Sequence, residues 1–508
     1  MDHLQQLAQT VIQWGALLLL FFVGVGALWI FVIYLVDKTQ KIHTIRRNYP
    51  VIGRLRYVFE HFGEFFRQYF FAMDREELPF NRAERSWVYR AAKNVDTTIA
   101  FGSTRPLDQP GDVIFLNSAF PVLSQDSADA GAITLGQGSC KQPYTTKSVI
   151  NISGMSFGAI SKPAVRALSR GAAAAGIWMN TGEGGLSSYH LEGGCDLVFQ
   201  IGTAKYGVRA AEGELDSVKL AAVAAHPQVK MFEIKMSQGA KPGKGGILPG
   251  GKVTEKIAEI RGITVGQDSI SPNGHEDIRS VNDLLDMIEN VREITGKPVG
   301  FKIVVGQIEF FHDLFDEINR RGVLSAPDFI TLDSADGGTG AAPQPLMDYV
   351  GLALRESLPM IVDKLVEYGL RDRIKVIASG KLITPGKVAW ALACGADIVT
   401  SARGFMFALG CIQALQCNKN TCPTGITTHQ KELQRGLVPA EKSLRVASFA
   451  QQIVHDVGVI AHSCGVSQPR ELERHHVRVI ESGGLSVSLA EQYPTPVVSQ
   501  KINLPPSV

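Results

Sequence analysis

Short apolar runs recur between residues 149 and 400 and alternate with segments of helical periodicity. The apolar runs are Val149–Ile152, Gly176–Met179, Leu197–Ile201, Met231–Ile234, Val299–Val304, Phe329–Leu332, Val376–Ala378 and Ile398–Thr400. The helical segments include Ala164–Ala175, Val281–Ile294, Ile308–Arg321 and Pro385–Ala393. Strand-like runs alternating with helices in this way predict an α/β fold, a (β/α)8 TIM barrel. The alternative is a doubly wound sheet, but no G-x-G-x-x-G opens a helix after the first run.

The N-terminal part of the chain has a different pattern. Trp14–Val36 is apolar and uncharged, and it is long enough to cross a hydrocarbon core of ~30 Å. A cleaved signal peptide fits less well, because no basic segment precedes the run; a buried core helix is the other alternative. Lys38, Lys41, Arg46 and Arg47 follow the run. By the positive-inside rule we predict a single-pass protein of the inner (cytoplasmic) membrane with its catalytic domain in the cytoplasm.

These patterns divide the chain into five segments. We predict a short tail over 1–13, a transmembrane helix over 14–36 and a juxtamembrane extension over 37–129. The barrel is expected over 130–430 and a C-terminal extension over 431–508. Aromatic residues between 49 and 94 recur at helical spacing, which indicates an amphipathic helix near the membrane surface or packed on the barrel. Another helix is expected at Ser443–His462.

Composition narrows the function classes. The chain has 508 residues, of which 45% are hydrophobic and 20% charged, as in ordinary globular proteins. A formal net charge of +2 gives no reason to expect a nucleic acid partner. Four of the seven cysteines are scattered singly, which fits a reducing compartment rather than a disulfide framework.

The other three cysteines lie close together. Cys411, Cys417 and Cys422 form a C-x5-C-x4-C run that ends in Cys-Pro. Thiolates at such spacing can bind an iron–sulfur cluster, zinc or copper(I). The lack of a fourth nearby Cys argues against a four-thiolate zinc or [4Fe–4S] site, and three ligands suit a [3Fe–4S] cluster. Three buried structural cysteines are the alternative.

Polar residues follow every predicted strand, where a barrel enzyme carries its active site. They are Ser153–Ser156, Asn180–Glu183, Gln200, Lys235, Lys302, Asp333 with Asp336–Thr339, Ser379-Gly380, and Ser401 with Arg403. The turns at Ser379 and Ser401 follow late strands, where such barrels often bind phosphate. A phosphate-bearing cofactor beside an iron–sulfur cluster suggests a flavin.

The loop after the fourth strand is rich in glycine and lysine. Lys235, Gln238, Lys241 and Lys244 indicate an anionic ligand, although a solvated lysine loop is the alternative. His275, in a later loop, is more often a structural residue than a catalytic one.

Several stretches resemble the FMN-binding synthase domain of the glutamate synthase large subunit. They are Met155–Ser161, Asn180–Gly185, Gln238–Gly243, Asp336–Gly340 and the three-cysteine run. The resemblance implies a (β/α)8 barrel with FMN and a [3Fe–4S] cluster. It also implies an oxidoreductase of the class acting on CH-NH2 donors. Such an enzyme reductively aminates 2-oxoglutarate, through 2-iminoglutarate, to glutamate with hydride from FMN.

The resemblance also assigns residues. Cys411, Cys417 and Cys422 would hold the cluster, and Glu183, Lys235, Gln238 and Lys241 would form the catalytic and 2-oxoglutarate side. The residues expected around FMN are Met155, Ser156, Gln200, Lys302, Gly338, Ser379 and Gly380. Gly337, Thr339, Ser401 and Arg403, at the same strand ends, complete the cofactor candidates.

Departures from the family pattern bear on the substrate. Lys244 and Ile247 stand where the family has Glu and Gln, Ala335 where it commonly has His, and Ser379 where it has Asp. The chain has no N-terminal Cys nucleophile and no dinucleotide-binding fingerprint. We therefore expect electrons from a donor protein or a membrane donor, and ammonia from a source such as a separate glutaminase subunit. The alternatives are a different 2-oxo acid or imine, or a membrane-anchored electron-transfer subunit.

Overall fold

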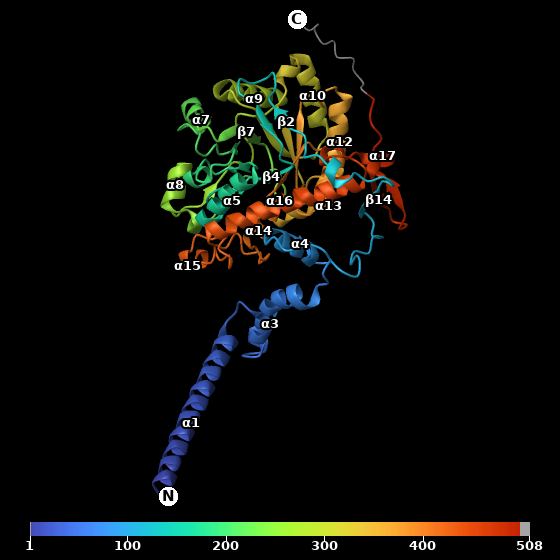
Figure 1. Cartoon of the computed structure of the whole chain (residues 1–508). Coiled ribbons are helices and arrows are strands. Elements are labelled where there is room, and N and C mark those ends of the chain that lie inside the picture. Colours follow the sequence, from blue (N-terminus) through green and yellow to red (C-terminus); the bar gives the residue numbers. More distant parts are fainter. Residues whose placement is uncertain (1, 498–508) are drawn as a thin grey trace. The chain divides into compact units, whose positions relative to one another are not determined.

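The computed structural model describes residues 2–497 and divides into two compact units, Met1–Arg82 and Ala83–Val508 (Figure 1). The first unit is helical: α1 (Asp2–Thr39), α2 (Thr44–Asn48), α3 (Gly53–Phe66) and a π-helical turn at Arg67–Phe71. Within α1, His3–Thr39 is long and apolar enough to cross a membrane. The helix begins at Asp2, so the residues expected to form a short tail are helical as well.

The second unit is built on a closed barrel of eight parallel strands, as predicted. The strands are β4 (Ile150–Ile152), β5 (Met179–Asn180), β6 (Leu197–Ile201), β7 (Val229–Lys235), β10 (Val299–Val304), β11 (Phe329–Asp333), β12 (Lys375–Ser379) and β13 (Ile398–Ser401). β13 pairs with β4, which closes the ring. Strands buried on both sides read as continuous apolar runs, and this is why the sequence located them well.

One predicted strand is misplaced. The run Gly176–Met179 does not form the second strand; β5 begins only at Met179. Gly176 instead ends the preceding helix, α5 (Lys162–Ala175), in the left-handed conformation at φ 65°. Glycine takes this conformation without steric cost, which explains its place at the helix end.

The remaining elements surround the barrel. The helices of the second unit are α4 (Arg82–Ala92), α5, α6 (Ser188–Leu191), α7 (Ser217–Ala224), α8 (Glu255–Arg261), α9 (Val281–Thr295), α10 (Glu309–Arg321), α11 (Gln344–Tyr349), α12 (Leu354–Glu367), α13 (Pro385–Ala393), α14 (Arg403–Leu409), α15 (Lys431–Gln434), α16 (Pro439–Ser463) and α17 (Leu489–Gln492). The helix expected at Ser443–His462 is α16, which packs against α5, α13 and α14. The aromatic residues with helical spacing lie on α3 and the turn Arg67–Phe71, and Pro79, which lacks a backbone donor, lies between them and α4.

Short antiparallel pairs complete the unit. β1 (Val113–Phe115), β14 (Val477–Ile480) and β15 (Ser486–Ser488) form one sheet, which joins the beginning and end of this unit. β8 (Ile247–Leu248) pairs with β9 (Ser269–Ile270). The hairpin of β2 (Ile133–Leu135) and β3 (Tyr144–Thr146) packs Leu135 and Tyr144 into a core cluster with Val198 and Phe329, near the amino ends of the strands.

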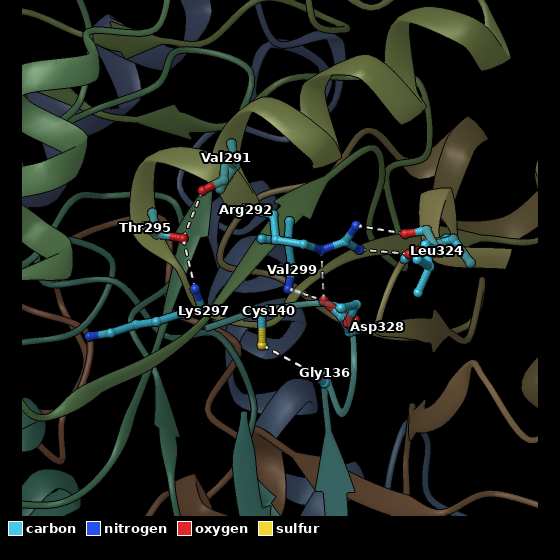
Figure 2. A network of polar contacts seen from close by, with 12 residues as sticks. Gly136, Cys140, Val291, Arg292, Thr295, Lys297, Val299, Leu324 and Asp328 are labelled. Carbon is cyan, nitrogen blue, oxygen red and sulfur yellow. Dashed lines mark hydrogen bonds and ion pairs between the residues drawn. The ribbon is translucent and has the colours of Figure 1, made fainter. Parts of the chain in front are cut away.

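A buried ionic network lies at the same end of the barrel (Figure 2). Asp328, which is fully buried, accepts hydrogen bonds from the Val299 amide at 2.8 Å and from Arg292 Nε at 3.3 Å. Arg373 Nη2 donates to the other carboxylate oxygen at 2.9 Å, and Ser139 Oγ donates to the same oxygen at 2.5 Å. These hydrogen bonds and ion pairs offset the free-energy cost of removing the Asp328 carboxylate from water. Because the partners come from α9, from β10 and from the segment before β12, the network ties these elements to the start of β11.

Candidate functional site

A pocket lies at the carboxyl ends of the strands, lined in part by β8 of the antiparallel β8–β9 pair. Its lining joins residues from the first strand loop, the hairpin region, the loop after β11 and the cysteine loop. The lining is Ser156, Ala159, Glu183, Lys241, Gly246, Ile247, Leu248, Pro249, Lys252, Arg261, Ser271, Thr339, Gly340, Ala341, Cys417 and Asn418. Ser156, Glu183, Lys241, Thr339 and Cys417, far apart in the sequence, were predicted as site residues and meet here.

Glu183 and Lys235 form an ion pair in this region. Lys235 Nζ lies 2.8 Å from Glu183 Oε1, and both side chains are largely buried. Burial raises the pKa of Glu183, but the positive charges of Lys235 and Lys241 outweigh it, so the pKa lies below its ordinary value. Glu183 is therefore ionised. A side chain on Gly246 would come within 2.6 Å of Glu183 Oε1, so the close approach of this loop requires glycine.

Two further cations line the pocket. The side chain of Lys241 is buried, and burial together with the charge of Lys235 lowers its pKa to about 8. Arg261, on α8, is also buried; its Nη2 lies 3.4 Å from Ser156 Oγ, and its Nε has no hydrogen-bond partner. A buried donor without a partner is costly, and an anionic ligand would satisfy it. Arg261 was not predicted as a site residue, because an arginine at a helix end is usually solvated.

A second network lies where β10, β11 and β12 end. Lys302 Nζ is 3.1 Å from Asp333 Oδ2, and Ser379 Oγ donates to Asp333 Oδ1 at 2.9 Å. The Gly239 amide also donates to Asp333, at 2.9 Å. Burial lowers the pKa of Lys302, but Asp333 and Glu233 outweigh this and raise it, so Lys302 carries its charge.

Glu233, inside the barrel on β7, was not predicted as a site residue. Its Oε2 accepts from Gln200 Nε2 at 2.6 Å and from Asn180 Nδ2 at 2.8 Å, and Thr331 donates to Oε1 at 2.6 Å. The residue is 3% exposed. Gln200, a predicted cofactor residue, is thereby held in place by a buried carboxylate. A glutamate within an otherwise apolar strand was the available sequence signal.

Neighbouring atoms lie close to the glycines expected at the cofactor site, where a Cβ would meet them. A Cβ on Gly338 would come within 2.7 Å of Arg403 Nη1. Gly380 has φ 134°, and a Cβ there would come within 2.3 Å of Ser334 Cβ. Gly337 approaches Gly239 closely as well. Backbone can therefore come near a ligand along this edge of the barrel.

Met155, Ser401, Gln238 and His275 lie outside the pocket lining. Met155 is buried, and its carbonyl lies 3.4 Å from His190 Nε2. Ser401 Oγ accepts from the Gly404 amide at 3.3 Å, at the start of α14. Gln238 is half-buried, lies in the loop after β7 and is outside the pocket lining. His275 is buried, with Nε2 3.0 Å from the Lys235 carbonyl, which is a structural role.

The cysteine loop has an unusual backbone. Gln413, Leu415 and Asn420 adopt positive φ angles of 58°, 54° and 59° although none is glycine. Such conformations persist where the surroundings hold them and cluster at functional sites. The Gln413 amide donates to Cys411 Sγ at 3.4 Å, and burial raises the pKa of this thiol to about 12. Tyr89 Oη, on α4, donates to the Cys411 carbonyl at 2.6 Å.

Lys252 connects this loop to the pocket and was not predicted. It is 3% exposed, and its Nζ donates to the carbonyls of Ala159 at 2.9 Å and Cys417 at 3.2 Å. Burial lowers its pKa to about 8. The side chain therefore ties the first strand loop to the cysteine loop and places a cation beside the thiols.

The two substitutions in the lysine loop have different surroundings. Ile247 lines the pocket with 39% of its surface exposed, and its partner across the hairpin is Ile270. Lys244 is exposed and lies outside the lining. Of these two residues, Ile247 is therefore the one that lines the pocket.

Comparison with known proteins places this geometry in a family. A family model described as the conserved region in glutamate synthase matches residues 113–467. The glutamate synthase large subunit-like protein YerD of Bacillus subtilis (strain 168) is 38% identical over 513 residues, covering 93% of this chain and 97% of that protein. The archaeal-type glutamate synthase [NADPH] of Thermotoga maritima is 34% identical over 333 residues, covering 65% of this chain and 62% of that protein.

Solved structures give a more distant likeness. The flavin-binding domain of baker's yeast flavocytochrome b2 aligns over 83% of this chain and 86% of that one, with 13% identity and a TM-score of 0.44. The family match rests on sequence and spans well over half of the chain, including every barrel strand. The chain therefore belongs to the family defined by the conserved region in glutamate synthase.

Proposed function

We propose that the chain is a membrane-anchored, FMN- and iron–sulfur-dependent oxidoreductase of glutamate synthase type, of the class acting on CH-NH2 donors. In this proposal it reductively aminates 2-oxoglutarate, through 2-iminoglutarate, to glutamate. The observation that carries it is the pocket lined by Glu183, Lys241 and Arg261, with Lys235 paired to Glu183. Three buried cations against one carboxylate favour an anionic substrate, and each substrate carboxylate would find a cationic partner.

The residues at the strand ends fit FMN. Gly338 and Gly380 leave room for close approach to the backbone, and Lys302 supplies a buried positive charge beside them. Gln200 presents an amide oriented by Glu233. When bound, FMN would supply the hydride that reduces the imine.

The cysteine loop fits an iron–sulfur cluster by its donor chemistry. Cys411, Cys417 and Cys422 are all free thiols within one shaped loop, and soft thiolates are the ligands that such clusters take. Within residues 2–497 no three His, Cys, Asp or Glu side chains are arranged to hold a metal ion. The three thiols would therefore have to move closer together when the loop binds a [3Fe–4S] cluster.

The protein's own side chains would act in the proton steps. Lys241 and Arg261 would hold the substrate carboxylates in the pocket. Glu183, kept ionised by Lys235, would accept a proton from ammonia during imine formation. The β8–β9 hairpin, which lines part of the pocket, would limit the access of water.

The setting of the enzyme is part of the proposal. α1 would cross the inner membrane once, with the basic residues after it placing the barrel in the cytoplasm. A donor protein or a membrane donor would supply electrons, and a separate glutaminase subunit is one source of ammonia.

The test is an anaerobic absorption titration of the full-length protein in detergent. Reduction with dithionite should bleach a flavin band, and 2-oxoglutarate with ammonium should restore it with glutamate as the product. Absence of flavin from the purified protein would overturn the proposal.

A second candidate keeps both cofactors but takes another 2-oxo acid. Ile247 favours it, because an apolar side chain lines the pocket where the family has a hydrogen-bonding one. A panel of 2-oxo acids in the same titration separates the two. Faster reoxidation by a monocarboxylic 2-oxo acid than by 2-oxoglutarate would support this second candidate.

A further inference from the structure

The first unit exposes a continuous apolar surface outside the spanning helix. The exposed large side chains on α3 and the π-helical turn, with Ile52 just before them, are Ile52, Leu55, Val58, Phe59, Phe62, Phe66, Tyr69, Phe70 and Phe71. Those from Ile52 to Phe66 recur at intervals of three and four residues and so form one stripe along the helix. Phe59 is 68% exposed and Phe70 75%. Soluble proteins rarely leave so many aromatic residues together in water.

A buried ion pair holds the start of this stripe at the end of α1. Asp37, on the last turns of α1, is 1% exposed. It accepts from Arg54 Nε at 2.9 Å, from Arg54 Nη2 at 2.8 Å and from the Val51 amide at 3.0 Å. A bidentate pair is the strong, oriented form of this interaction. α3 is therefore fixed where the apolar helix ends.

Polar contacts, rather than apolar ones, hold the inner side of this unit. The Arg46 guanidinium lies 4.4 Å from the centre of the Tyr57 ring, and His43 packs edge-on against the same ring. A Cβ on Gly53 would come within 2.9 Å of the Ile45 carbonyl, so α2 and α3 approach closely. The contacts inside this unit are therefore largely polar, whereas the large apolar side chains of the stripe are exposed.

Exposed basic residues lie close to the stripe in the sequence. They are Lys38, at the end of α1, Lys41, and Arg47, on α2. Basic residues next to a spanning helix attract the anionic lipids of a cytoplasmic leaflet.

We propose that α3 and the turn Arg67–Phe71 lie in the membrane interface, with the stripe that begins at Leu55 inserted among the lipid acyl chains. The inference rests on the proposed anchoring by α1, because the Asp37–Arg54 pair fixes α3 at the end of that helix. Aromatic side chains suit the interfacial region, and the basic residues would contact anionic headgroups. The barrel would then be attached through an in-plane element as well as through the spanning helix.

Photocrosslinking in the full-length protein tests this. A benzoylphenylalanine is introduced in place of Phe59, or of Phe62, and the protein is reconstituted in vesicles of phosphatidylcholine and phosphatidylglycerol. Leu20, on α1, is the positive control, and Glu60, on the polar side of α3 where it pairs with Arg56, is the matched negative control. Mass spectrometry of the irradiated protein identifies the adducts.

Lipid adducts at Phe59, Phe62 and Leu20, and none at Glu60, are the expected result. Adducts at Leu20 but none at Phe59 or Phe62 would overturn the interfacial placement and leave the anchoring intact. Crosslinks from Phe59 to a second copy or to another part of the chain would also overturn it. If Leu20 itself gave no lipid adduct, the anchoring would fail, and the interfacial placement with it.

Discussion

Lys235 Nζ lies 2.8 Å from Glu183 Oε1 in a largely buried position at the barrel mouth. The pair joins the ends of β5 and β7 and keeps the carboxylate ionised inside the protein. An ionised carboxylate can accept a hydrogen bond or a proton from a substrate nitrogen. The pair with Lys235 therefore fixes the charge state in which Glu183 would meet a substrate.

Glu183→Gln should abolish most of the turnover while the flavin stays bound. The amide keeps the shape but cannot accept a proton, and loss of general base catalysis costs about 100- to 10,000-fold in rate. Turnover and the flavin-to-protein ratio are measured together, with exposed Glu255→Gln on α8 as the control. Unchanged turnover would contradict a catalytic role and favour an electron-transfer subunit.

Lys241 should make substrate affinity depend on pH. Its pKa of about 8 in the folded protein lies below the ordinary 10.5, so the ammonium loses its proton as the pH rises through 8. KM for 2-oxoglutarate should therefore rise above pH 8, and Lys241→Met should raise KM and remove this dependence. The same shift has a consequence for stability: between pH 8 and 10.5 the unfolded chain binds more protons, so this residue's contribution to stability increases with pH. A flat KM profile in the wild type would refute the assignment.

Lys302→Met should lower flavin content and stability. It leaves Asp333 buried without its cation, and a broken buried ion pair costs about 3–5 kcal/mol. Adding Asp333→Asn should recover much of the thermal stability but not the flavin, because the positive charge stays absent. Flavin absorbance and melting temperature are the measurements, with Lys375→Met as the control. Full flavin content in the single variant would exclude Lys302 from the cofactor site.

Cys422→Ser should remove iron from the purified protein and leave the flavin. Serine does not provide the soft thiolate that an iron–sulfur cluster takes. Cys464→Ser, at another free cysteine outside the loop, is the matched control and should keep the wild-type iron content. Iron analysis and low-temperature electron paramagnetic resonance report the result. Equal iron in both variants would argue for structural cysteines in this loop.

Ile247→Gln should improve the use of 2-oxoglutarate. The side chain faces the pocket, and one added hydrogen bond to a charged substrate group is worth about 1.5–3 kcal/mol, or about 10- to 150-fold in affinity. Ile270→Gln, directly opposite on the hairpin and outside the pocket lining, is the control and should change nothing. A weaker response to 2-oxoglutarate in Ile247→Gln would point to a different 2-oxo acid.

The sequence predicted the position of a residue well where that position depends only on the direction of the strand before it. Strands buried on both faces had to be apolar, and residues directly after them had to meet at one end of the barrel, which located Glu183 and Lys302. Arg261 and Lys252 reach the pocket from a helix end and a loop, so only the folding of the β8–β9 region brings them there. Gly176 was predicted to begin a strand from its apolar neighbours, but it ends α5, because glycine readily adopts the left-handed backbone angle needed there.

The Asp328 network lies at the amino ends of the strands, whereas the pocket lies at the carboxyl ends. Two arginines and a backbone amide hold that carboxylate without contacting any group that would touch substrate. Mutations in the loops around the pocket can therefore accumulate without loosening the scaffold. Position 247 lies in such a loop and lines the pocket, so its side chain can vary independently of the scaffold.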